Sequence, residues 1–373
     1  MLVVGGGAIG LACAWRLAQR GLRVRVLERD RPGAGASGVA AGMLAPVGEA
    51  TWGEEELLRL ALASHALWPD FAAQLAAASG RDVGYSELGA LHVALDRDEA
   101  AELRRRYELM ESLGLEAEWL RPGAVRELEP GVSPQCAVGI HAPGESAVAP
   151  AQLVAALAEA AAREGVEVAD GSEAAAPVLD GDRLGGVRTA DGAEHLARHT
   201  LLASGAWSGA ATWLPEPARP PVRPVKGQIL TLRALAGPVC EHIIASERVY
   251  MVPRADGRLV IGATVEEQGF DARVTAGGVH ELLREAYRAL PDVAELELIE
   301  ARVGVRPGSP DNAPLIGSGA LEGLILATGH FRSGILLAPA TAEAIADLLC
   351  EEEPEIDIGA FSPARFERQA VAG

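Results

Sequence analysis

The stretch LVVGGGAIG, residues 2–10, decides the fold of this chain. An apolar run leads into a G-x-G-x-x-G turn, a helical segment over 11–20 follows, and a second apolar run over 22–27 ends at Glu28. This order of strand, glycine turn, helix, strand and acid is typical of a dinucleotide-binding unit. A bare G-x-G-x-x-G also occurs in flexible surface loops, but here every accompanying part is in register. We therefore predict an α/β fold that opens with a dinucleotide site.

Each polar or glycine position of this unit has a separate physical role. Gly5 permits the tight turn, Gly7 lets the backbone approach a pyrophosphate, and Gly10 lets the helix pack closely on the strand. The free N–H groups and the positive dipole end of the helix attract phosphates. Glu28 follows Gly10 by 18 residues and is placed to accept hydrogen bonds from a ribose. The motif alone does not distinguish FAD from NAD.

Composition and charge exclude several kinds of partner. The chain has 373 residues, of which 49% are hydrophobic, enough for two domains with sizeable cores. A net charge of −19 argues against nucleic acid or an anionic membrane as partner. The chain has no apolar run of about 18 residues or more, so we predict no membrane span. The N-terminal apolar run lacks a preceding basic segment and is expected to be a first strand, not a signal peptide.

The four cysteines are scattered without the spacing of a metal site. They are Cys13, Cys136, Cys240 and Cys350. Such a distribution favours reduced thiols in a cytoplasmic protein over a disulfide framework. We predict a cytoplasmic protein with no metal.

Apolar periodicity and turn residues predict the remaining elements. Helices are expected over residues 54–78, 98–113, 151–163, 278–289 and 338–350, and strands over 88–95, 228–232, 249–252, 259–261 and 324–329. Prolines predict a loop over 122–143 and a domain crossing over 219–224. Short runs after residue 163 predict a β-meander that returns to an apolar strand at 200–207, a pattern of FAD proteins.

Two groups of side chains within these helices have ordinary structural interpretations. Trp68 and Phe71 are expected in the core. Arg104, Arg105 and Arg106 are expected to form the solvated face of their helix.

Seven stretches carry a family resemblance that covers the whole chain. They are VVGGGAIG (3–10), SGVAAGMLAP (37–46), VKGQ (225–228), YMVPR (250–254), GRLVIGAT (257–264), GVRPGSPDNAPLIG (304–317) and ATGHFRSGILLAPAT (327–341). In this order they resemble the FAD-dependent D-amino-acid oxidase family, and within it the glycine-oxidase branch of thiamine biosynthesis. The last stretch is the most specific, because it is similar to the C-terminal flavin loop of that branch.

The resemblance implies two domains. One is an FAD-binding Rossmann-like domain of the glutathione-reductase type, and the other is a substrate-binding domain with a mostly antiparallel sheet. Residues 1–82, 148–214 and 301–373 are assigned to the FAD-binding domain, and residues 83–147 and 215–300 to the substrate-binding domain.

The resemblance also implies which residues contact FAD. Besides the three motif glycines they are Ala8, Ile9, Glu28, Arg29, Ala36, Ser37, Ala41, Gly42, Met43, Ala174, His330, Phe331, Arg332, Ser333, Gly334, Ile335 and Leu336. In the family the 330–336 loop wraps the isoalloxazine, so His330 is expected against the flavin without a proton-transfer role. Sarcosine-type relatives attach FAD to a cysteine before a turn such as Ser309-Pro310-Asp311. No cysteine stands there, so FAD is expected to be non-covalent.

Tyr250, Arg306 and Arg332 match the family's substrate-binding positions. A guanidinium grips a planar carboxylate bidentately, and a tyrosine hydroxyl adds a further hydrogen bond. Judged without the resemblance, Arg306 could be an ordinary surface arginine and Tyr250 a core residue. Val265 stands where glycine oxidases can carry a bulkier residue, so it is expected to open the substrate pocket to larger side chains.

The reaction implied is oxidative deamination of glycine or another small amino acid. Hydride passes from Cα to flavin N5, and O2 reoxidises the flavin, giving an oxo acid, ammonia and H2O2. No catalytic side-chain base is expected. A broader D-amino-acid oxidase, a sarcosine or secondary-amine oxidase, a quinone-linked dehydrogenase and a non-catalytic flavin-binding scaffold are the alternatives. Members of the family often form homo-oligomers, which extends to this chain by analogy alone.

Overall fold

A six-stranded sheet carries the opening glycine turn in the computed structural model, which describes residues 1–235 and 237–366. The strand order is β19-β20-β13-β1-β2-β9. The parallel strands are β1 (Leu2–Val4), β2 (Arg25–Leu27), β9 (Glu167–Ala169), β13 (Thr200–Leu202) and β20 (Leu324–Thr328). β19 (Leu315–Ser318) pairs antiparallel with β20. A central β1 followed by a helix is the arrangement of a dinucleotide-binding fold. The predicted α/β fold is confirmed.

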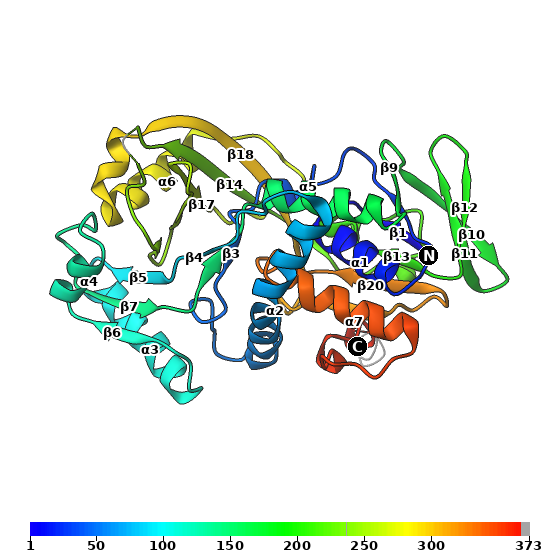
Figure 1. Cartoon of the computed structure of the whole chain (residues 1–373), viewed down its shortest axis with the longest axis horizontal. Coiled ribbons are helices and arrows are strands. Elements are labelled where there is room, and N and C mark those ends of the chain that lie inside the picture. Colours follow the sequence, from blue (N-terminus) through cyan, green and yellow to red (C-terminus); the bar gives the residue numbers. More distant parts are fainter. Residues whose placement is uncertain (236, 367–373) are drawn as a thin grey trace.

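The two faces of this sheet contact different layers, because successive side chains of a strand point to opposite sides. Val3 and Val26 belong to a core shared with four helices. These are α1 (Ala8–Gln19), α2 (Glu55–Ser79), α5 (Pro150–Arg163) and α7 (Ala338–Cys350). Leu2 and Val4 pack on the other side against a three-stranded meander. It consists of β10 (Ala174–Asp180), β11 (Arg183–Thr189) and β12 (Glu194–Leu196), at one end of the molecule in Figure 1.

The second half of the molecule is an eight-stranded sheet in the order β18-β14-β17-β16-β15-β5-β7-β6. Its strands are β18 (Glu297–Gly308), β14 (Arg223–Arg233), β17 (Arg258–Gly262), β16 (Tyr250–Pro253), β15 (Ile243–Ala245), β5 (Ala90–Ala94), β7 (Val138–Ala142) and β6 (Glu118–Leu120). All neighbours are antiparallel except β15 and β5, as the resemblance predicted.

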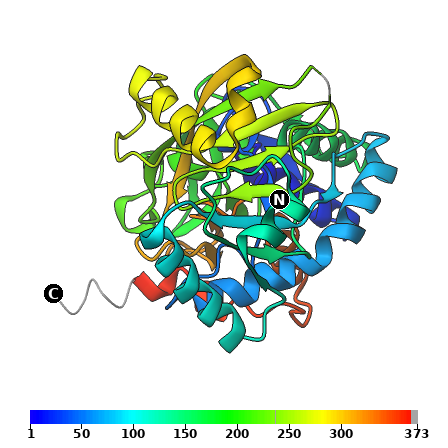
Figure 2. The same ribbon diagram turned by 90° about the vertical axis from the view of Figure 1, so that its left-hand side faces the viewer.

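Helices cover parts of this second sheet. α6 (Ala276–Ala289) packs on β14 and β17, and α3 (Arg97–Ser112) packs on β5 and β7. Figure 2 views the molecule from this end, with α6 in yellow above α3 in cyan. No helix in the described part of the chain is long and apolar enough to cross a bilayer.

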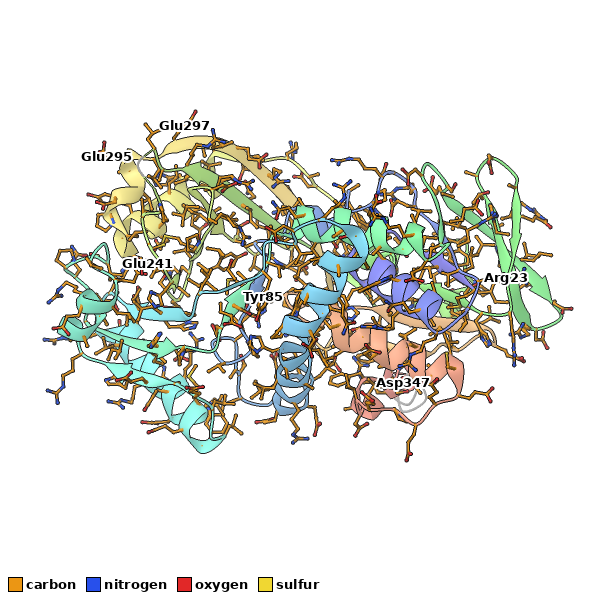
Figure 3. All side chains as sticks on the ribbon, in the orientation of Figure 1. Arg23, Tyr85, Glu241, Glu295, Glu297 and Asp347 are labelled. Atoms are coloured by element: carbon orange, nitrogen blue, oxygen red, sulfur yellow. The ribbon has the colours of Figure 1, made fainter. Side chains whose placement is uncertain are left out.

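A small sheet lies between the two halves. It pairs β3 (Met43–Leu44) and β4 (Ser86–Glu87) with β8 (Ser146–Ala147). Tyr85, which precedes β4, is labelled in this middle region in Figure 3. The predicted division into two discontinuous domains remains a prediction, and β18 runs without a break across its last boundary, at residue 300.

The predicted helices and strands correspond to elements of the structure, except that the strand expected over 200–207 ends at Leu202 and residues 205–207 form a 3-10 helix. Two other predictions are also corrected. The expected loop over 122–143 contains α4 (Pro122–Leu128) and β7. Pro122 begins α4 because a proline in the first helical turn loses no hydrogen bond. Arg106 is not on the solvated face of α3: it is half-buried and donates to the carbonyl oxygen of Gly48.

The core of the first half reaches the loop that precedes α7. Trp68 is 0% exposed and packs edge-on against Phe71, with ring centroids 5.4 Å apart, so the predicted core position of both is confirmed. Trp68 Nε1 and Ser64 Oγ donate to the same carbonyl oxygen, that of Leu336, at 2.9 and 2.7 Å. α2 therefore fixes the backbone of the 330–336 loop.

Trp68→Phe tests this anchor. The change removes a buried hydrogen bond and ring volume, so we expect the free energy of unfolding to fall by about 2–4 kcal/mol. Thermal unfolding followed by circular dichroism should show Tm lowered by several degrees. Trp52→Phe is the matched control, because Trp52 is 64% exposed and its replacement should leave Tm unchanged. Equal Tm values for the two variants would contradict the anchoring role.

Candidate active site

A cavity of about 480 Å³ lies between the two large sheets and is lined by both halves of the molecule. Its glycine-turn side is formed by the turn after β1, the end of β2, residues 33–43 and Ala174. Its sheet side is formed by β14, β16 and β18, and the 330–336 loop contributes as well. A concave site of this size, mostly apolar with a few polar groups, suits a small-molecule or cofactor ligand.

All but one of the predicted site residues line this cavity. They are Gly5, Gly7, Ala8, Ile9, Glu28, Arg29, Ala36, Ser37, Ala41, Gly42, Met43, Ala174, Tyr250, Arg306, His330, Phe331, Arg332, Ser333, Gly334, Ile335 and Leu336. The exception is Gly10, where a Cβ would overlap the carbonyl oxygen of Gly5. Gly10 therefore serves the close packing of α1 on the turn, as its motif position predicts.

The glycine turn forms a cradle that a phosphate group fits. Gly5 has φ +113, and a Cβ there would collide with the carbonyl of Ala203. The N–H of Ala8 donates to Ser37 Oγ at 3.0 Å. The N–H groups of Ile9 and Gly10 have no partner among residues 1–235 and 237–366. Unpaired N–H groups at a helix N-terminus bind anions readily.

Glu28 is fixed at the end of β2 by backbone donors. Its Oε2 accepts from Gly6 N at 2.7 Å, and its Oε1 accepts from Asp30 N at 2.9 Å. The carboxylate lines the cavity on the same side as Ala174. This position suits the predicted contact with a ribose hydroxyl.

Arg306 is held on the sheet side by backbone carbonyls. Its Nη1 donates to Thr264 O at 3.0 Å and more weakly to Lys226 O at 3.5 Å. No carboxylate in the described part of the chain forms an ion pair with its guanidinium. The charge is therefore fixed in place and still open to an anionic ligand.

Two glycines inside strands make room for the predicted substrate-binding side chains. Gly227 of β14 lies against the Arg306 guanidinium, and Gly262 of β17 lies opposite Tyr250 of β16. A Cβ on either glycine would overlap the facing polar group. A glycine within a strand often marks such a close approach, and this signal could have found both positions from the sequence.

Tyr250 and His330 keep single protonation states over the physiological range. Burial raises the pKa of Tyr250, and nearby Arg306 only partly opposes that shift, so the hydroxyl stays a donor. Burial lowers the pKa of His330 to about 3, so its ring stays neutral. His330 Nε2 lies 3.0 Å from Thr341 Oγ1. The low pKa makes the ring a weak base, in line with the expectation that His330 transfers no proton.

Three further residues that the sequence reasoning missed line the cavity. The Trp207 ring stacks on the Phe270 ring, with 5.4 Å between centroids. The Arg29 guanidinium lies 4.7 Å from the centroid of the Trp207 ring. Glu49 lies on the same wall as Arg332. No local motif marks these positions, because the contacts join segments far apart in the chain.

Val265 does not open the pocket as expected. Its side chain is 63% exposed and does not line the cavity. Thr264 and Glu266 turn inward, where Thr264 Oγ1 donates to Glu266 Oε1 at 2.6 Å and Lys226 N donates to Glu266 O at 2.9 Å. Side chains alternate along an extended segment, so Val265 points to solvent.

Comparison with known proteins identifies the family. A model of the FAD dependent oxidoreductase family matches residues 1–348. The chain belongs to this family. It is 37% identical to glycine oxidase of Geobacillus kaustophilus (strain HTA426), covering 97% of this chain and 96% of that protein. The crystal structure of glycine oxidase from Geobacillus kaustophilus superposes with a TM-score of 0.90 at 36% identity, covering 98% of both chains.

A bifunctional protein is also similar to this chain. The oxidoreductase is 35% identical to the bifunctional protein ThiO/ThiG of Trichormus variabilis (strain ATCC 29413 / PCC 7937). The match covers 99% of this chain, which spans 55% of that relative.

The cofactor of this oxidoreductase is FAD. The cradle around Gly5 and Gly7 fits its pyrophosphate, and the fixed carboxylate of Glu28 fits a ribose. None of the four cysteines lines the cavity, which supports the prediction that FAD is held without a covalent bond.

Gly7→Val tests the cradle. The added side chain would enter the cavity where the pyrophosphate is expected, so we expect the Kd for FAD to rise at least tenfold. The measurement is protein-bound flavin absorbance after gel filtration, with fluorescence titration of the apoprotein. Gly144→Val is the control, because Gly144 is exposed with nothing near its Cβ. Normal flavin content in Gly7→Val would remove Gly7 from the site.

Proposed function

We propose that this oxidoreductase oxidises glycine or another small amino acid to the oxo acid and ammonia, with O2 as electron acceptor and H2O2 as product. The observation that carries the proposal is the Arg306 guanidinium, which no carboxylate among the described residues pairs with, beside the Tyr250 hydroxyl on the wall of the FAD cavity. A fixed guanidinium with an adjacent hydroxyl donor suits a carboxylate. The similarity to glycine oxidase supports the same substrate class.

The protein's part in the reaction is to bind and orient the substrate. Arg306 and Tyr250 hold the carboxylate, which fixes the direction of the Cα–H bond relative to the 330–336 loop. When bound, FAD accepts the hydride from Cα and passes the electrons to O2. Arg332, on the same loop, adds positive charge to the wall. The neutral ring of His330 supports the loop without exchanging protons.

The proposal also covers the cellular location, the pathway and the assembly of the protein. The protein has four free cysteines, three of them buried, which agrees with a cytoplasmic enzyme. Its similarity to the bifunctional protein ThiO/ThiG supports a role in thiamine biosynthesis. A homo-oligomeric state remains an analogy with the family.

Oxygen consumption and peroxide release by the purified yellow enzyme test the function. We expect turnover with glycine to exceed turnover with sarcosine, D-alanine and D-proline. A preference for the larger or secondary amines would favour the broader oxidase. Slow O2 uptake combined with fast dye reduction would favour a dehydrogenase that uses another acceptor. Failure of every amino acid to bleach the flavin would refute the proposal.

Arg306→Ala tests the substrate clamp, which is the pair of Arg306 and Tyr250 proposed to hold the substrate carboxylate. Removing a desolvated charge that pairs with the carboxylate costs several kcal/mol, so we expect KM for glycine to rise about 100-fold or more. Flavin content should stay normal. The matched control is Arg59→Ala on α2, since the Arg59 side chain is 68% exposed and its ion pair among the described residues is with Glu56. Unchanged steady-state kinetics in Arg306→Ala would exclude Arg306 from substrate binding.

A further inference from the structure

Three acidic side chains line the FAD cavity, and only one of them lies near the substrate clamp. Glu28 and Asp30 belong to the glycine-turn side. Glu49 lies near Arg332 and Tyr250: Arg332 acts to lower the pKa of Glu49, and Glu49 contributes to raising the pKa of Tyr250. Glu49 also lines a small neighbouring cavity with Arg332. On this side of the cavity Glu49 is the one carboxylate that the described residues supply.

The Glu49 carboxylate is not used by the fold. Within residues 1–235 and 237–366 no group donates a hydrogen bond to it, and no cation forms an ion pair with it, although its backbone N–H bonds Ala45 O at 3.2 Å. Glu145 behaves differently: it accepts from Gly48 N and faces His92 Nε2 at 3.8 Å. A carboxylate that lines a cavity without a partner is available to a ligand.

The surroundings of Glu49 tune its proton affinity. Burial raises its pKa, and the charge of Arg332 opposes this shift. The titratable and charged groups that face it are Arg332, Glu145, Arg106, His92 and Tyr250. A carboxyl whose pKa is raised is, in its ionised form, a better proton acceptor than an ordinary glutamate.

An amino-acid substrate needs such a group. At neutral pH it carries a carboxylate and an ammonium, and a site with two guanidinium groups repels the ammonium. Hydride loss from Cα also requires a free electron pair on nitrogen, so one ammonium proton must leave. Arg306 and Tyr250 cannot take it, because a guanidinium has no acceptor and Tyr250 stays protonated.

We propose that Glu49 binds the substrate ammonium and accepts its proton, in place of the expectation from the sequence that no side-chain base takes part. One N–H bond of the ammonium breaks, the proton passes to a carboxylate oxygen of Glu49, and the electron pair remains on nitrogen. This assignment rests on the proposed function. It makes Glu49 the residue that selects amines over other small carboxylic acids.

Glu49→Gln in the FAD-loaded enzyme separates amine binding from carboxylate binding. The two probes are glycine and acetate, since acetate has the carboxylate and no amine. We expect KM for glycine to rise at least tenfold, while the Kd for acetate, read from the perturbed flavin absorbance, changes less than twofold. Glu54→Gln is the matched control, because Glu54 lines only the small neighbouring cavity. It should leave both values unchanged.

The pH profile is a second readout that a purely structural role would not move. In the wild type, kcat/KM should fall on the acid side as Glu49 becomes protonated. In Glu49→Gln only glycine with a free amine can react, so kcat/KM should rise about tenfold per pH unit toward the alkaline pKa of that amine. The deficit of the variant should therefore shrink steadily as pH increases.

Several outcomes would overturn the assignment. Equal weakening of glycine and acetate would mean that Glu49 shapes the pocket without contacting the amine. Tighter acetate binding with an unchanged KM for glycine would mean that Glu49 only offsets the charge of Arg332. A pH profile parallel to that of the wild type would exclude proton transfer. Failure of the proposed function is distinct, because the wild-type flavin would then not be reduced by amino acids at all.

Discussion

The guanidinium of Arg306, held by two backbone carbonyls and by no carboxylate in the described chain, is the interaction on which the site depends. A buried charge without compensation is very unfavourable, and carbonyl dipoles supply part of that compensation without neutralising it. The positive potential left over attracts an anion. The long β14–β18 ladder supplies the rigid backbone for this arrangement, and Gly227 supplies the space. In the proposed function, substrate recognition therefore depends on strand pairing as much as on the Arg306 side chain.

The cavity is formed by both halves of the molecule together, and contacts between the two halves hold it in shape. Arg254 and Arg302, from the eight-stranded sheet, donate to the carbonyl oxygens of Ala41 and Gly38 in the segment that lines the cofactor cavity. Within the first half, α2 holds the 330–336 loop through the carbonyl oxygen of Leu336. These contacts therefore fix the relative positions of the glycine turn around Gly5, the 330–336 loop and the pair Arg306 and Tyr250.

Sequence reasoning succeeded where local backbone chemistry decides the outcome. The turn around Gly5 needs positive φ, so the first unit and its place in a parallel sheet were predictable. It failed where a local rule has two solutions. A proline can begin a helix as well as interrupt one, and Pro122 begins α4. Side chains alternate between two faces along an extended segment, and the Val265 side chain lies on the solvent face. Glu49 and Phe270 reach the cavity only through tertiary packing, so no periodicity or spacing marks them.

Lys226, the only lysine of the chain, is 1% exposed and lies beneath the segment that carries Phe270. Its Nζ lies 3.5 Å from Glu266 and 3.8 Å from Asp271, which tie that segment to β14. The folded enzyme consequently presents no lysine amine to acylating reagents. Because modification of Lys226 requires this segment to lift, the rate at which the peptide containing Lys226 is acylated would report how often the wall over the cofactor cavity opens.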